Sequence, residues 1–167
     1  MKIHMKKHLI CLSLVSFLWL PVNAAWSGDF IAARAAYIDR DYEEAAQLFH
    51  ELAQEGDHRG MSFLGRMYNK GMGVRKNPAE SIRWHQAAAK KGNGFSANQV
   101  ALAHLRGQGV KQDPVRAEMW FTIAIQRGFG WANRKALEKK LTREQAMRGR
   151  KMAADFMKNN NMEYKRK

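Results

Sequence analysis

The chain has 167 residues, with 29 lysines and arginines against 15 aspartates and glutamates, three prolines and one cysteine. Its length accommodates one modest domain, and an apolar fraction of 46% excludes wholesale disorder. A single cysteine excludes a disulfide framework and a cysteine-rich metal site. The net charge of +14 favours anionic partners in general but identifies none of them.

Residues 1–24 have the three parts of a secretory signal peptide. Three lysines precede an uncharged apolar run from Leu9 to Leu20, and small residues follow up to Ala24. The run holds 12 residues and reaches only about 18 Å as a helix, which is short of the roughly 30 Å hydrocarbon core of a membrane. We therefore expect cleavage between Ala24 and Ala25, a periplasmic or secreted protein, and no transmembrane segment in the mature chain.

The positive charge that remains after this cleavage is concentrated near the C-terminus. The mature chain keeps 26 basic and 15 acidic side chains. Residues 25–133 carry 14 basic and 11 acidic ones, whereas residues 134–167 carry 12 and 4. The basic character therefore belongs to the C-terminal region.

A 36-residue period runs through the mature chain and predicts a repeat architecture. Trp84 recurs as Trp120, and stepping back by the same interval reaches Leu48 in a fainter third copy. The positions in register, which we expect to be structural, are Gly71, Gly73, Val74, Pro78, Trp84, Ala88 and Gly92, with Gly107, Gly109, Val110, Pro114, Trp120, Ala124 and Gly128 as their counterparts.

Residues 25–57 predict a divergent helical hairpin in which only Asp39–Asp41 separates the two helices. Asp41 and Glu44 have the spacing of a capping box at the start of the second helix. Residues 58–93 and 94–129 each predict two antiparallel helices joined by a loop whose two glycines suit a positive φ. The valine of that loop turns back into the core, and Asn77 or Asp113 caps the second helix just before a proline.

The second helix of each unit has one apolar face. Ser81, Trp84, His85 and Ala88 lie at positions i, i+3, i+4 and i+7, and the neighbouring units repeat the pattern. A unit of this size does not bury such a face alone, so the units must stack. The predicted fold class is therefore all-α, an α-solenoid of stacked helical hairpins.

Two segments resemble Sel1-like repeats, which are relatives of the tetratricopeptide repeat with a longer GxGV-containing loop. They are FLGRMYNKGMGVRKNPAESIRWHQAAAKKG and VALAHLRGQGVKQDPVRAEMWFTIAIQRG. The hairpin at residues 25–57 is closer to the tetratricopeptide form. Gly60 and Ser96 replace the usual alanine, His104 replaces the usual tyrosine, and no third GxGV loop follows Leu137. The resemblance implies a right-handed solenoid from an exported bacterial member of the family.

The C-terminal segment predicts a cap followed by a tail. Thr142 and Gln145 have capping-box spacing, and residues 130–157 are expected to form terminal capping helices. Residues 158–167 are expected to form a basic, disordered tail, with the three asparagines at 159–161 as an unstructured spacer.

The residues do not support an enzyme. His50-Glu51 begins like a zinc-protease helix, but Gln54 stands where the second histidine would be. No serine is followed three residues later by a lysine, and GxGxxG is absent. We predict no catalytic residue, no cofactor and no metal site.

The family resemblance implies a binding scaffold, since exported bacterial members are often periplasmic adaptors or regulators. We predict a protein or peptide partner in the cell envelope, bound along the concave surface formed by the first helices of the units. The candidate partner-binding residues are Arg66, Asn69, Lys70, Gln99, Leu105 and Arg106, which we expect to point away from the core.

An alternative function is attraction to an anionic envelope polymer or a membrane surface through the basic C-terminal region. Nucleic acid fits the charge but not the export signal, so we expect no nucleic-acid partner. The residues of this alternative are Arg143, Arg148, Arg150, Lys151, Lys158, Lys165, Arg166 and Lys167.

Overall fold

The computed structural model describes residues 22–162, with side chains from residue 29 onward. In this part of the chain the structure is all-α, as predicted, and it has eight helices. Their bounds are α1 Val22–Asp39, α2 Tyr42–Gln54, α3 His58–Lys70, α4 Pro78–Lys90, α5 Gly94–Arg106, α6 Pro114–Ile125, α7 Trp131–Glu138 and α8 Arg143–Asn159. None of these helices is long and apolar enough to cross a membrane.

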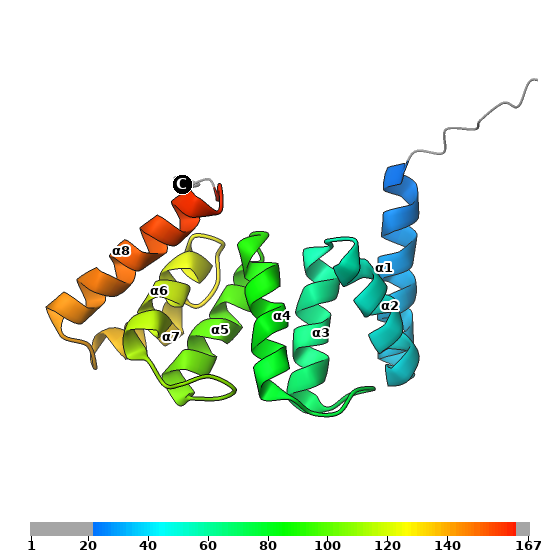
Figure 1. Ribbon diagram of the computed structural model, residues 1–167, viewed down its shortest axis with the longest axis horizontal. Coiled ribbons are helices and arrows are strands. Elements are labelled where there is room, and N and C mark those ends of the chain that lie inside the picture. The colour runs from blue at the N-terminus through cyan, green and yellow to red at the C-terminus, as the bar shows by residue number, and fades with distance from the viewer. Residues whose placement is uncertain (1–21, 163–167) are drawn as a thin grey trace, which may run out of the picture.

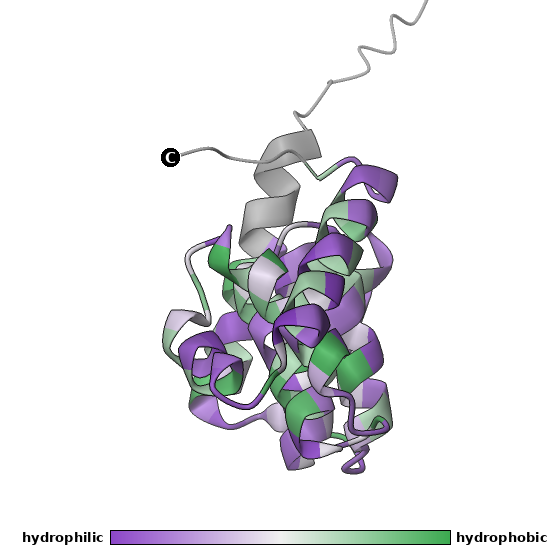
Figure 2. Ribbon diagram, turned by 90° about the vertical axis from the view of Figure 1, so that its left-hand side faces the viewer, coloured by the Kyte–Doolittle hydropathy of each residue, from purple (hydrophilic) through white to green (hydrophobic). Residues whose placement is uncertain are grey.

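The helices form three stacked hairpins, α1–α2, α3–α4 and α5–α6, and α7 and α8 pack against α6 at the C-terminal end (Figure 1). The two long GxGV loops lie at one edge of the stack. The short turns between hairpins lie at the opposite edge (Figure 1). Hydrophilic and hydrophobic residues alternate along the helices, as expected for amphipathic helices that each bury one face (Figure 2).

Most of the predicted helix signals act where the sequence places them. The side chains of Asn77 and Asp113 each accept a hydrogen bond from a backbone N–H in the first turn of α4 and α6, and a proline follows each of them. Thr142 and Gln145 form the expected capping box on α8. All six repeat glycines of the loops and turns have positive φ, and the two loop valines pack against the core.

The two GxGV loops are also joined to their hairpins by equivalent hydrogen bonds. The Asn77 N–H donates to the Tyr68 carbonyl, and the Asp113 N–H donates to the His104 carbonyl, both at 2.9 Å. The two donors are 36 residues apart in the sequence, and so are the two acceptors. The period seen in the sequence is therefore a period in backbone hydrogen bonding.

The interior consists of two hydrophobic clusters that meet at α4. The N-terminal cluster includes Phe49, Leu64 and Met67, and the C-terminal cluster includes Trp120 and Phe121. Each hairpin thus packs mainly against its neighbours, as in other repeat proteins.

The two indoles in register both pack against this interior, as predicted. Trp120 is buried and meets the edge of the Phe156 ring at 5.0 Å between centroids. Trp84 is partly buried against the N-terminal cluster and meets the His50 ring edge-on.

Two local predictions are wrong. Asp41 forms no side-chain cap on α2, because Arg40 adopts a positive φ of 70° and the Asp41 N–H bonds back to the Ala36 carbonyl, which closes the end of α1. Asp41 still occupies the N-cap position of α2, where its carbonyl accepts from the Ala45 N–H, but its own N–H is already bonded and is not free for the Glu44 side chain of a capping box.

The asparagines at 159–161 are not an unstructured spacer. Asn161 has a positive φ of 51°, its N–H donates to the Lys158 carbonyl, and the Met162 N–H donates to the Met157 carbonyl. This is the Schellman pattern, and the two methionines supply its buried apolar contact. The helix therefore continues past the expected start of the tail, and the run of asparagines terminates it. Residues 163–167 lie outside the described part of the chain, as does most of the expected signal peptide.

Candidate protein-interaction surfaces

Three of the six candidate partner-binding residues line one small cavity between α3, α4 and α5. Asn69 comes from the end of α3, and Gln99 and Arg106 come from α5 one unit later. Ser81, His85 and Gln108 complete the polar part of the lining, and the cavity measures about 70 Å³. We call it the inter-repeat cleft. It exists only because two units stack.

The other three candidates lie elsewhere. The guanidinium of Arg66 lies over the rings of Phe63 and Tyr37, at 5.2 and 5.7 Å from their centroids. Lys70 is exposed at the end of α3. Leu105 is half-buried and packs against the C-terminal cluster, which differs from the expectation that it points away from the core. The reason is that α5 packs against both α4 and α6, so more of its circumference is covered.

The wall of the cleft contains a buried polar chain that the sequence did not reveal. The Ser96 hydroxyl donates to Ser62 Oγ at 3.0 Å, and Ser96 Oγ lies 3.1 Å from His85 Nδ1. Burial, with a smaller contribution from the charge of Arg66, lowers the pKa of His85 to about 4. His85 is therefore neutral at physiological pH. Gly65 makes room for it, because a Cβ at residue 65 would lie 2.7 Å from the ring.

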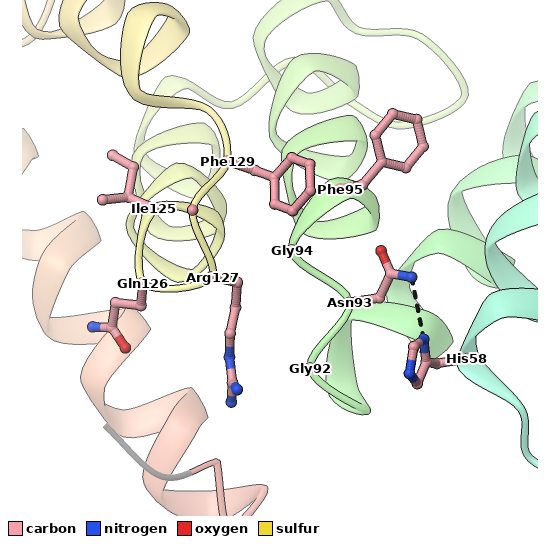
Figure 3. Close-up of a pocket in the computed structure, with 10 residues that line it drawn as sticks. His58, Gly92, Asn93, Gly94, Phe95, Ile125, Gln126, Arg127 and Phe129 are labelled. Atoms are coloured by element: carbon pink, nitrogen blue, oxygen red, sulfur yellow. Dashed lines mark hydrogen bonds between the residues drawn. The ribbon is translucent and has the colours of Figure 1, made fainter. Parts of the chain in front are cut away.

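A second and larger site lies at the edge that carries the short turns. The α4–α5 turn and the α6–α7 turn enclose a groove of about 660 Å³, which we call the turn groove. Figure 3 shows the rings of Phe95 and Phe129 side by side at one end of it and Arg127 extending along the α4–α5 turn. The two ring centroids are 6.4 Å apart, edge to face. The amide of Asn93 is hydrogen-bonded to the ring of His58 at 3.3 Å (Figure 3).

Charge is distributed very unevenly over the stack. Residues 29–57 carry eight acidic and two basic side chains, whereas residues 58–162 carry six acidic and 21 basic ones. The turn groove lies in the basic part. Its lining includes Arg127 and His58 and no carboxylate.

The C-terminal basic residues divide into two groups. Arg150 donates to Glu118 and Glu138, and Lys151 pairs with Asp155, so these two are engaged within the described structure. Arg143, Arg148 and Lys158 are exposed on α8. No group of three or more potential metal ligands occurs within the described residues.

Comparisons with known proteins agree with this architecture. A protective antigen of uropathogenic Escherichia coli with an SLR fold superimposes with a TM-score of 0.74 at 24% identity, over 80% of this chain and 30% of the antigen. A Sel1 repeat protein from Oxalobacter formigenes superimposes with a TM-score of 0.56 at 23% identity, over 65% of this chain and 48% of that protein. This chain thus spans less than half the length of either. At this identity the likeness shows the fold alone.

A comparison with curated proteins found no match. The Sel1 repeat family matches residues 33–57, 58–93 and 94–129, which is more than half of the chain. The first segment covers the end of α1 and all of α2, and the other two contain the hairpins α3–α4 and α5–α6. The chain belongs to the Sel1 repeat family.

Proposed function

We propose that this protein is a non-catalytic scaffold of the bacterial cell envelope that binds a protein or peptide along the surface formed by α3 and α5. The observation that carries the proposal is the convergence of Asn69, Gln99 and Arg106 on the inter-repeat cleft. Amide and guanidinium groups of this kind pair with the backbone and acidic side chains of a peptide. Helical repeats of the Sel1 type typically mediate protein interactions, which also supports the binding of a protein or peptide here.

Site-specific photo-crosslinking in cells tests this proposal. A photoreactive residue at position 99 is expected to capture a defined protein, because the cleft faces its partner there. The matched control is the same residue at Lys111, which is exposed in the GxGV loop outside the cleft. The variant Arg106→Glu should abolish capture from position 99 while the protein stays folded. Equal capture from both positions would contradict the proposal.

Export is tested separately. The signal-peptide pattern at residues 1–24 supports an envelope location, and N-terminal sequencing of the protein from the periplasmic fraction should begin at Ala25. A protein that is found in the cytoplasm and still begins at residue 1 would contradict this part of the proposal.

The alternative is binding to an anionic polymer or membrane surface through exposed α8 residues such as Arg143, Arg148 and Lys158. It predicts release by a few tenths molar salt, because screening shortens the reach of exposed charges to a few ångströms. It also predicts loss of binding when all three are changed to glutamine. Binding of a partner in the inter-repeat cleft predicts neither release by this concentration of salt nor loss of binding in the triple variant.

A further inference from the structure

We propose that the turn groove is a second binding site, which takes an acidic peptide segment with an apolar side chain next to a carboxylate. The inference rests on the proposed scaffold function in that the ligand is a peptide. Beyond that function, the inference places a separate site at the edge of the stack and specifies the kind of peptide that this site binds.

Phe95 and Phe129 form the apolar part of the turn groove. Phe129 lies in the α6–α7 turn and contacts the ring of Phe95, yet 45% of its surface stays exposed. In the preceding unit the residue in register with Phe129 is Asn93, which caps α5. The repeat architecture therefore does not require an aromatic side chain at this position. The exposed Phe129 ring, with the half-buried Phe95 ring beside it, offers a surface for an aromatic or aliphatic side chain.

Arg127 supplies the positive charge of the turn groove. Its guanidinium lies over the α4–α5 turn, 3.5–3.6 Å from where a Cβ on Gly92 would stand. Among the residues that the structure describes, no carboxylate lies within salt-bridge distance of Arg127. A partly buried guanidinium is an effective partner for a carboxylate, because it makes two parallel hydrogen bonds and is weakly hydrated.

The size and surroundings of the groove agree with a short peptide segment. Its volume of about 660 Å³ lies in the usual range of ligand sites. Lys90 and Lys91 are exposed at the end of α4, beside the turn that lines it. Anionic groups are thus attracted to this edge, and the basic surroundings disfavour a cationic segment.

Titration of the purified, processed protein with short blocked peptides tests the proposal by ¹H–¹⁵N NMR. The probe is Gly-Ser-Asp-Phe-Asp-Ser-Gly, and its matched controls replace both aspartates by asparagine or the phenylalanine by serine. We expect the probe to shift the amide signals of residues 92–95 and 125–129. Each control peptide should bind at least tenfold more weakly, because one loses the carboxylates and the other loses the apolar side chain.

Variants separate this site from the inter-repeat cleft. Arg127→Gln and Phe129→Ser should each weaken binding of the probe at least fivefold without altering the circular dichroism spectrum, since both side chains are partly exposed. Lys111→Gln and Arg106→Glu should leave it unchanged.

Three results would overturn the proposal. They are an absence of shifts in the two turns, equal binding of the asparagine peptide, and unchanged binding by Arg127→Gln. Equal binding of the serine peptide or of polyaspartate would show a general anion surface, which also overturns it. None of these results affects crosslinking from position 99, so the scaffold proposal stands or falls on its own experiment.

Discussion

Gly107 and Gly109 belong to the same loop and have nearly the same φ, 71° and 74°, yet their surroundings differ. A Cβ at Gly107 would meet nothing closer than 3.4 Å, whereas a Cβ at Gly109 would overlap the Pro78 carbonyl. Gly73 stands in the same relation to the Tyr42 carbonyl. Tyr42 and Pro78 begin α2 and α4 and are 36 residues apart, so each loop rests on the start of the preceding hairpin's second helix.

This difference predicts unequal effects of alanine at the two glycines. Gly107→Ala should lower the free energy of unfolding by about 1 kcal/mol, which is the cost of a left-handed conformation for a residue with a Cβ. Gly109→Ala should lower it by roughly 2–4 kcal/mol, because displacement of the loop from α4 is added. Urea denaturation measures both values. Equal losses would show that the loop does not press on α4.

His85 predicts a specific dependence of stability on pH. Its pKa is about 4 in the folded protein and about 6.5 when unfolded, so the unfolded state binds more protons between these values. The contribution to stability is fully present above pH 6.5 and is lost as the pH falls toward 4, by about 3 kcal/mol in total. Burial also lowers the pKa of His104, which acts in the same direction.

Urea denaturation between pH 7.5 and 4.5 measures this loss. The variant His85→Phe, which copies Phe121 of the next unit, should have a shallower pH dependence than the natural protein. His50→Asn is the matched control, because His50 is exposed, and should keep the full dependence. An unchanged slope in His85→Phe would exclude the buried imidazole as its source.

At the scale of elements, a buried ion network fastens the C-terminal cap to the stack. The side chain of Glu118 on α6 is fully buried, and its Oε1 lies 3.0 Å from the Arg134 guanidinium on α7 and 3.1 Å from Arg150 Nε on α8. Both arginines also reach Glu138. Gly149 lets α8 approach closely, because a Cβ there would lie 2.8 Å from Glu118. Two arginines from separate helices thus bridge the buried carboxylate of Glu118 and the carboxylate of Glu138.

Removal of both arginines should loosen the cap. The double variant Arg134→Ala and Arg150→Ala leaves the carboxylate of Glu118 buried without a partner, which costs about 3 kcal/mol or more. Hydrogen exchange should accelerate across α7 and α8 and stay slow in α2 and α3. Arg148→Ala, an exposed change on α8, is the control and should change stability by less than about 0.5 kcal/mol. Undiminished protection of α8 in the double variant would show that apolar packing alone holds the cap.

At the scale of the whole molecule, the two hydrophobic clusters predict that the stack does not unfold as one unit. Phe49 is fully buried in the N-terminal cluster and stacks on Phe63 at 4.4 Å between centroids. Phe49→Ala should cost about 3–5 kcal/mol through the lost contacts and the cavity. The loss should accelerate hydrogen exchange in α1–α3 and spare α6–α8, because stability passes only between neighbouring units. Gln47→Ala, an exposed change on α2, should have little effect. Uniform acceleration would indicate one cooperative core.

Much of the fold was predictable, because its signals are local. The caps at Asn77, Asp113 and Thr142 and the glycines that end helices act within a few residues of themselves, so their spacing is visible along the chain. Asp41 was mispredicted for the same reason: a capping-box spacing does not reveal that the residue is already used to close α1. Of the candidate partner-binding residues, Gln99 and Arg106 lie seven positions apart on one face of α5 and meet Asn69 of α3 at the cleft, whereas Leu105 packs against the C-terminal cluster. Their partner-binding role stays a prediction.

The amino-acid sequence alone determined the 36-residue period, the helical hairpins and the chemistry of their loops, since turns, caps and amphipathic faces depend on neighbouring residues. Only the tertiary structure decided which side chains meet across units. The chain from His85 to Ser96 and Ser62, the burial of Glu118 between two arginines, and the pairing of Phe95 with Phe129 join residues between 11 and 34 positions apart. Such contacts depend on how closely one hairpin approaches the next, which is set by the volume of every side chain between them.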